Sequence, residues 1–173
     1  MTRRILNTTL ALILQGDKVL LGEKKRGFAA GTFNGIGGKQ DPGETIDEAM
    51  VRETQEEIGV TPTNYKKVGN IDFINIVYKG ERVDIKLHIY TCGGYVGEIK
   101  ETGEMIPQWF NIKDVPYDKM LPDDTSWFPL VLEGKKVKGT ISYGETPADT
   151  VRKISVVKSA AKTVTTEEKE NVM

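Results

Sequence analysis

The spacing of apolar and polar residues along the chain predicts a β-sheet that is interrupted by one long helix. Near the N-terminus, apolar runs at residues 10–14 and 19–21 flank Gly16 and Asp17, a pattern typical of a hairpin. Later segments rich in β-branched and aromatic residues favour strands at residues 67–77, 83–92, 105–110, 137–143 and 151–157. A helical turn or two is expected at residues 127–132.

The long helix is expected at residues 46–58, because both of its ends carry capping signals. Thr45 is a candidate N-cap, and Glu48 three residues later completes a capping box. Pro42 prevents an earlier start, and Gly59 supplies a C-terminal stop. Strands on both sides of one well-capped helix indicate a mixed α/β or α+β domain.

The chain has 173 residues, the size of one domain, which we expect over residues 1–158 with a mobile polar tail at 159–173. Lys and Arg total 24 and Asp and Glu total 25, so there is no basic field to hold a polymeric nucleic acid. No apolar run reaches the roughly 20 residues of a membrane span, and no signal peptide is recognised. We therefore expect a cytoplasmic protein without a membrane partner, and leave monomer or dimer open.

The single cysteine, Cys92, and the single histidine, His88, limit the possible chemistry. One cysteine excludes a disulfide framework and thiolate metal clusters, and one histidine excludes zinc sites that need two imidazoles. His88 alternates with apolar residues in a predicted strand, so we expect it to pack or face the surface, and Cys92 to be a small buried residue. Any catalysis here must then use carboxylates and hydroxyls.

The predicted helix places two carboxylates on its apolar side. At about 100° per residue, Glu53 and Glu57 fall on the same stripe as Ile46 and Met50, and Glu56 flanks them. An ordinary acidic helix would instead direct these groups into solvent. Carboxylates that crowd together repel one another, and a cation between them removes that cost. Oxygen ligands without His or Cys select Mg²⁺, or else Mn²⁺.

The glycine-rich segment before the helix favours a phosphate ligand beside this cation. Gly37 and Gly38 allow the backbone to approach a ligand closely. Lys24 and Lys39 could then meet phosphate oxygens, although each lysine taken alone is also compatible with an ordinary surface charge.

These residues resemble a known family. Gly38, Glu44, Arg52, Glu53, Glu56, Glu57 and Gly59 stand at the spacings of the Nudix box. One position departs from it: Thr54 occupies a place where the family prefers an aliphatic residue. The resemblance implies hydrolysis of a nucleoside diphosphate linked to a further group, on a fold with a mixed β-sheet between helices. It also implies metal ligation by Glu53, Glu56, Glu57 and the Gly37 carbonyl, with Arg52 and Glu44 orienting those carboxylates.

Other segments narrow the resemblance to the branch of MutT homologues that hydrolyse oxidised purine nucleoside triphosphates, such as 8-oxo-dGTP. They are residues 19–22, 24–28, 34–35, 122–124 and 127–130. By that similarity the base pocket is lined by Asn34, Asp123 and Asp124, with Thr9, Phe28, Phe73 and Trp127 around it. Lys24 would reach toward the nucleotide, and Glu104 would join the metal cluster or act as a base.

The adjacent Asp123 and Asp124 are expected to do more than form a turn. Two carboxylates in an apolar pocket should share a proton, so that one donates and the other accepts a hydrogen bond. Such a pair fits a guanine edge and, with the proton relocated, an oxidised adenine. Leu121 and Phe33 stand at positions where the branch has Trp. Loss of one aromatic stacking partner lowers the binding free energy of a base by about 1–3 kcal/mol, so we expect a broader range of substrates.

The expected reaction releases a nucleoside monophosphate and pyrophosphate by attack of an activated water. Glu57 and Glu104 are the candidates for the general base, with Glu53 to be tested beside them. Other readings are a Nudix hydrolase of a different nucleoside diphosphate derivative and a Nudix domain that only senses a nucleotide. A calcium-binding helix is disfavoured because no Asp-x-Asp-x-Asp-Gly loop is present.

Overall fold

Strand β1 lies in the middle of a mixed sheet, with the order β3-β2-β1-β5-β4-β7-β8 and with β6 also paired to β2. The computed structural model describes residues 3–27 and 29–157 of the chain. The strands are β1 (Arg4–Gln15), β2 (Lys18–Lys24), β3 (Phe33–Asn34), β4 (Thr61–Tyr78), β5 (Glu81–Val96), β6 (Met105–Asn111), β7 (Lys136–Ser142) and β8 (Val151–Val157). Among the strand pairs of these described residues, β1–β5 and β4–β7 are parallel and the others are antiparallel.

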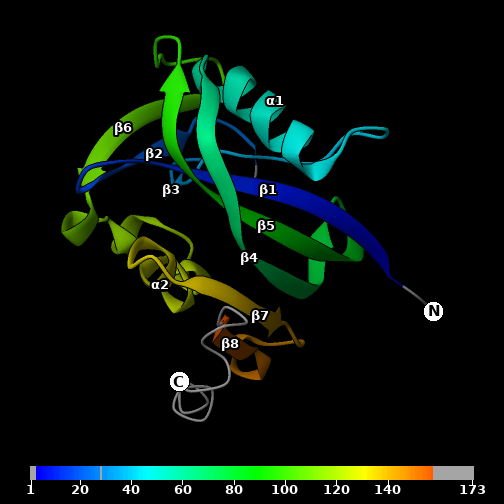
Figure 1. Cartoon of the computed structure of the whole chain (residues 1–173). Helices are drawn as coiled ribbons and strands as arrows, with labels where there is room; N and C mark the ends of the chain where they lie inside the picture. The colour runs from blue at the N-terminus through cyan, green and yellow to red at the C-terminus, as the bar shows by residue number, and fades with distance from the viewer. Residues whose placement is uncertain (1–2, 28, 158–173) are drawn as a thin grey trace.

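Two α-helices cover opposite faces of this sheet: α1 (Ile46–Ile58) and α2 (Phe128–Leu132) (Figure 1). Short 3₁₀ helices occupy Ile112–Asp114, Tyr117–Lys119, Pro122–Ser126 and Pro147–Asp149. The predicted fold class, a mixed sheet between helices, is therefore confirmed. Within the described ranges, neither helix is long and apolar enough to cross a membrane.

The side chains of β1 alternate between two hydrophobic cores. Leu10 and Leu12 join a cluster with Phe128 of α2, whereas Ala11 and Ile13 join a cluster with Met50 of α1. Successive strand residues point to opposite faces, so one strand contributes to both cores. This alternation also decides which functional side chains can share a site.

Helix α1 forms as its capping signals predict. Thr45 accepts a hydrogen bond from the Glu48 amide, and the Glu48 side chain accepts one from the Thr45 amide. Gly59 ends the helix with φ 81°, a left-handed conformation that glycine adopts without strain. The predicted bounds of this helix are confirmed.

The strand predictions hold in position but not always in length. β4 and β5 extend well beyond residues 67–77 and 83–92, because they pair along most of one long hairpin and carry polar residues such as Thr61 and Thr63 into the ladder. The two-residue strand β3 and the 3₁₀ helices were not expected, since such short segments have no periodicity to detect. The predicted tail, residues 159–173, lies outside the described residues.

Candidate active site

Glu53, Glu56 and Glu57 of α1 differ in how far their side chains are exposed. The Glu53 side chain is 13% exposed, and Glu57 is 7% exposed. The Glu56 side chain is 52% exposed and lies beside Arg52. The structure thus turns Glu53 and Glu57 toward the body of the protein, as their place on the apolar stripe of the helix predicts.

The glycine segment lies directly against these two carboxylates. The Gly37 amide donates a hydrogen bond to Glu57 Oε1 at 3.0 Å. A Cβ atom at Gly38 would lie 2.4 Å from Glu53 Oε2, and one at Gly37 would lie 1.8 Å from the Thr9 carbonyl oxygen. Gly37 therefore requires glycine for its close approach to the backbone of β1, whereas a side chain at position 38 would displace the Glu53 carboxylate.

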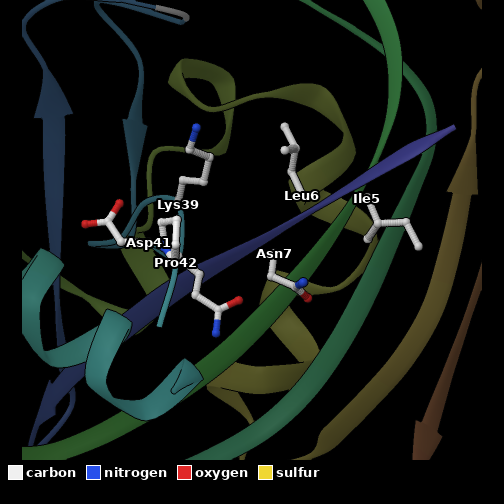
Figure 2. Close-up of a pocket in the computed structure, with 7 residues that line it drawn as sticks. Ile5, Leu6, Asn7, Lys39, Asp41 and Pro42 are labelled. Atoms are coloured by element: carbon white, nitrogen blue, oxygen red, sulfur yellow. The ribbon is translucent and has the colours of Figure 1, made fainter. Parts of the chain in front are cut away.

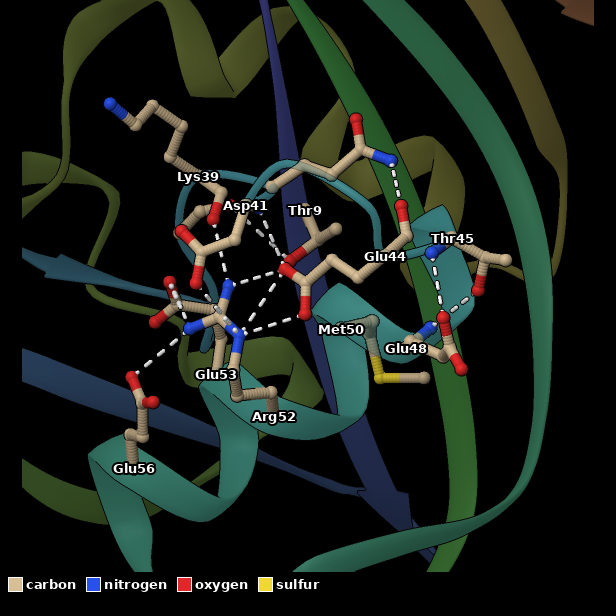
Figure 3. Close-up of polar contacts among 12 residues, drawn as sticks. Thr9, Lys39, Asp41, Glu44, Thr45, Glu48, Met50, Arg52, Glu53 and Glu56 are labelled. Atoms are coloured by element: carbon tan, nitrogen blue, oxygen red, sulfur yellow. Dashed lines mark hydrogen bonds and ion pairs between the residues drawn. The ribbon is translucent and has the colours of Figure 1, made fainter.

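Arg52 holds the acidic residues around it in fixed positions (Figure 3). Its Nη2 donates to Glu44 Oε1 at 2.7 Å and to the Lys39 carbonyl at 2.9 Å. Its Nη1 lies 3.3 Å from Glu53 Oε2 and 3.1 Å from Glu56 Oε1. The hydrogen bond from Arg52 lowers the pKa of Glu44. Such a fork can orient several carboxylates at once.

The pKa values of both inward-facing carboxylates are raised. Burial raises the pKa of Glu57 to about 8, and the charges of Glu53 and Glu104 add to the rise. Burial also raises the pKa of Glu53, which Arg52 opposes. Glu104 therefore lies close enough to influence both carboxylates, although it is itself partly exposed and pairs with Arg26 at 3.5 Å.

The donor set at this centre fits a hard divalent cation. In the described part of the chain, no three Asp, Glu, His or Cys side chains lie close enough together to hold one metal ion. The Glu56 carboxylate pairs instead with Arg52. Even so, carboxylate oxygens predominate, and Glu53 and Glu57 are buried at a cost that a cation would relieve. The residues that could hold it are Glu53, Glu56, Glu57, Glu104 and the carbonyl of Gly37.

A cavity of about 440 Å³ opens on the other face of β1. Its apolar wall includes Phe73 and Leu121, and its polar lining includes Lys24, Asn34 and the two aspartates of the Pro122–Ser126 3₁₀ helix. The structure thus brings together most of the residues predicted for the base pocket. Lys24 connects the two centres, because it lines the cavity and its charge also acts on Glu57.

The two aspartates of this cavity differ in their surroundings. Asp124 is 4% exposed, and its Oδ2 atom has no hydrogen-bond partner among the described residues. Burial, together with the neighbouring Asp123 carboxylate, raises the pKa of Asp124 to about 7. Asp123 instead accepts hydrogen bonds from Tyr143 and Arg152. The pair is therefore asymmetric.

Two other residues predicted for the base pocket, Thr9 and Trp127, do not line the cavity. Thr9 is buried on the opposite face of β1, where its amide bonds the Gly38 carbonyl, and Thr8 lines the cavity in its place. Trp127 is fully buried in the core with α2 and does not line the cavity. Phe28 lies outside the described residues. Strand alternation explains why Thr9, which the resemblance placed around the base pocket, faces the other side of β1.

Lys39 borders a separate, shallower cavity of about 270 Å³ beside the start of β1 (Figure 2).

His88 and Cys92 are packing residues in the structure. His88 Nδ1 lies 2.6 Å from Lys67 Nζ, and its Nε2 lies 2.9 Å from Asn7 Oδ1. Burial lowers the pKa of His88 to about 4 and raises that of Cys92 to about 12.

Sequence reasoning missed two residues that touch the predicted pocket. Tyr143, which follows β7, lines the cavity, and Arg152 of β8 reaches Asp123 from outside it. Neither residue belongs to a motif. The only available signal was the order of the predicted strands, which does not say which side chain of the last hairpin meets the aspartates.

The chain is similar to several known proteins. The family model of the NUDIX domain matches residues 5–131. An oxidized purine nucleoside triphosphate hydrolase of Danio rerio is 47% identical over 135 residues, covering 78% of this chain and 85% of that protein. The protein of the same name from Mus musculus is 44% identical over the same shares. The crystal structure of a mutator MutT protein from Bacillus halodurans has a TM-score of 0.71 at 28% identity, covering 87% of this chain and 97% of that one.

Proposed function

Because the chain belongs to the Nudix family, we propose that it hydrolyses oxidised purine nucleoside triphosphates to the monophosphate and pyrophosphate. One observation carries the proposal. The buried carboxylates of α1 and the cavity with Asp123 and Asp124 lie on either side of β1, and Lys24 adjoins both. A base in the cavity would direct its phosphates past Lys24 toward Glu53 and Glu57. The likeness to the two named vertebrate hydrolases supports the same substrate class.

Nudix hydrolases use a divalent cation, and we propose Mg²⁺ for this chain. Glu53, Glu56, Glu57 and Glu104 would hold it together with the Gly37 carbonyl. When bound, such an ion neutralises phosphate charge and lowers the pKa of a nearby water. Mn²⁺ accepts the same oxygen ligands and could substitute.

The protein's own residues orient and deprotonate the attacking water. Arg52 and Glu44 fix the direction of Glu53 and Glu56 through the hydrogen bonds of the guanidinium. The Gly37 amide fixes Glu57. A carboxylate at this site accepts the proton of the water as the phosphorus–oxygen bond breaks, and Glu57, Glu104 and Glu53 are the candidates in that order.

The cavity supplies the contacts for the base. Phe73 and Leu121 give it an apolar wall, and Asn34, Asp123 and Asp124 offer donors and acceptors to a purine edge. A neutral Asp124 donates to a carbonyl oxygen, whereas Asp123 accepts from N–H groups. Leu121 stacks less strongly than an aromatic residue, so we expect a broader substrate range than an aromatic wall would give. A cytoplasmic location remains a prediction of the sequence.

A nucleotide panel tests the proposal. Pyrophosphate release is measured with 8-oxo-dGTP, dGTP, dCTP, a nucleotide sugar and a dinucleoside polyphosphate in the presence of Mg²⁺. We expect the highest kcat/KM with 8-oxo-dGTP. A higher value with the sugar or dinucleotide would assign a different member of the Nudix hydrolases, and binding without turnover of any nucleotide would assign a sensor.

The substitution Asp123→Asn tests the base pocket in the same assay. Loss of the charged acceptor should lower kcat/KM for 8-oxo-dGTP by about ten- to a hundredfold, the range for a hydrogen bond to a charged group. The value for dCTP should fall much less, because a pyrimidine does not present the same edge. Equal losses for both nucleotides would contradict the role of Asp123 in base recognition.

A further inference from the structure

The Asp123 carboxylate is held by two residues of the β7–β8 hairpin, of which Tyr143 lines the cavity and Arg152 does not. The Tyr143 hydroxyl donates a hydrogen bond to Asp123 Oδ2. The Arg152 Nε atom donates to Asp123 Oδ1 at 2.7 Å, and its Nη2 pairs with the same oxygen. We call Tyr143 and Arg152 the hairpin clamp.

The backbone holds the clamp in place from both sides. The Tyr143 amide donates to the Ile74 carbonyl at 3.0 Å, and Asn75 Nδ2 donates to the Tyr143 carbonyl at 2.8 Å. Asn75 lies at an irregularity of β4 with φ 68°, and its amide donates to Asp84 Oδ1. Arg152 pairs in register with Ile141 of β7. The Tyr143 hydroxyl is thereby aimed at Asp123 by a braced segment of main chain.

The hydrogen-bonding capacities of the clamp residues determine the role of Asp123. A guanidinium has only donors and stays protonated in proteins, and here it contacts one carboxylate oxygen through two of its nitrogens. The Tyr143 hydroxyl donates to the other oxygen. These three donors, two of them on a fixed positive charge, favour the ionised carboxylate and leave one lone pair on Oδ2, so Asp123 can still accept a hydrogen bond from a base.

Asp124 has no such partner. Its Oδ2 atom is buried and unpaired among the described residues, and the titratable or charged groups that line the same cavity are Lys24, Asp123 and Tyr143. Of these, Asp123 is the immediate neighbour and carries negative charge, which favours a proton on Asp124.

We propose that Tyr143 and Arg152 are positioning residues for specificity, which keep Asp123 as the acceptor of the pair and the proton on Asp124. The cavity then prefers a purine with an oxygen at C6 over one with an amino group there. This inference rests on the proposed function as far as substrates are concerned, while the placement of the proton can be tested without any substrate.

The edge chemistry of the two purine classes gives the direction of the preference. In the orientation of the base that the proposal requires, Asp124 faces the substituent at C6 and Asp123 faces N1. The O6 acceptor of a guanine edge then meets a protonated Asp124, and its N1–H and N2–H donors meet an ionised Asp123. An adenine edge places its amino donor where guanine has O6, so it requires the proton on the other aspartate. The clamp opposes that exchange.

Steady-state kinetics with 8-oxo-dGTP and 2-oxo-dATP test the preference. The variants are Tyr143→Phe, Arg152→Met and the double variant, with Lys153→Met as the control for loss of a neighbouring β8 cation. We expect the ratio of kcat/KM for the two nucleotides to fall by about tenfold or more in the double variant, as when charge-assisted hydrogen bonds are lost. The Lys153→Met ratio should match that of the wild type. Tyr143→Phe keeps the ring, so it reports on the hydroxyl even if the double variant folds poorly.

A carboxyl ¹³C NMR titration of the substrate-free protein tests where the proton resides. In the wild type, the Asp124 signal should move near pH 7 without a matching change at Asp123. In the double variant both signals should move together, as expected for a shared proton. An unchanged kinetic ratio or an unchanged titration overturns the proposal. If the wild type hydrolyses neither nucleotide, the proposed function fails and the titration alone decides whether the clamp controls the proton.

Discussion

The molecule contains two acidic centres that share one plan. At each centre an arginine binds a carboxylate, Arg52 at Glu44 on the α1 side and Arg152 at Asp123 on the cavity side. Beside each pair lies a buried carboxylate with no ion pair among the described residues. Burial raises the pKa of these two groups, Glu57 to about 8 and Asp124 to about 7.

The centres differ in how the chain assembles them. Residues 37–59 supply the glycine segment, the helix and nearly all ionisable groups of the first centre. The second centre takes residues from β2, β3, β4, the Pro122–Ser126 3₁₀ helix and the β7–β8 hairpin. The comparison indicates that the hydrolytic chemistry is a local property of one segment, whereas base selection is a property of the tertiary structure. The predictions below test that division.

The largest effect is expected from Glu57→Gln. Loss of a candidate base and metal ligand should lower kcat by about 10²–10⁴-fold for every nucleotide. Because Glu57 is a buried carboxylate without a cationic partner, the variant should also be at least as stable as the wild type in EDTA at neutral pH. Steady-state kinetics and thermal melting measure both, with the exposed Glu98→Gln as the control. A loss confined to purine substrates would contradict the division between the two centres.

The next effect concerns Asp124→Asn and the pH dependence of stability. The pKa of Asp124 is raised from 3.8 to about 7, so its contribution to stability is complete below about pH 4 and is lost as the pH rises through 7. The wild type should therefore lose about 3 kcal/mol of unfolding free energy relative to the variant between about pH 5 and pH 8. Urea unfolding at both pH values measures this difference, and parallel pH profiles would contradict the assignment of the buried proton.

The smallest effect is expected from Arg52, which acts through the carboxylates it orients. Arg52→Met should lower kcat/KM by about 10–100-fold and raise the Mg²⁺ concentration needed for half-maximal activity by a similar factor. Arg52→Lys keeps the charge but loses the fork and should restore only part of the activity. Lys113→Met is the exposed control. An effect that differs between 8-oxo-dGTP and dCTP would show that the two centres are not independent.

The sequence predicted the first centre well because its signals are periodic and local. Thr45, Glu48 and Gly59 define the helix, and helical spacing alone turns Glu53 and Glu57 inward. Even Thr54, the departure from the box, is accommodated within the helix: it is fully buried, and its hydroxyl donates to the Met50 carbonyl.

The second centre was only partly predictable because its geometry depends on strand register. Thr9 and Thr8 are adjacent in sequence, yet they face different sites. Arg152 lies 29 residues from Asp123, and no sequence spacing relates the two. Phe33 packs edge-on against Phe110 in the core, with ring centroids 5.3 Å apart, so its difference from tryptophan concerns packing.

The position of β8 at one end of the sheet order has an evolutionary consequence. Substitutions in this outermost hairpin can retune which damaged base is accepted, while the catalytic helix several strands away is left untouched. Substrate preference could then change during evolution without loss of catalytic activity. Exchange of this hairpin between relatives is accordingly a way to redesign the specificity of an oxidised-nucleotide hydrolase.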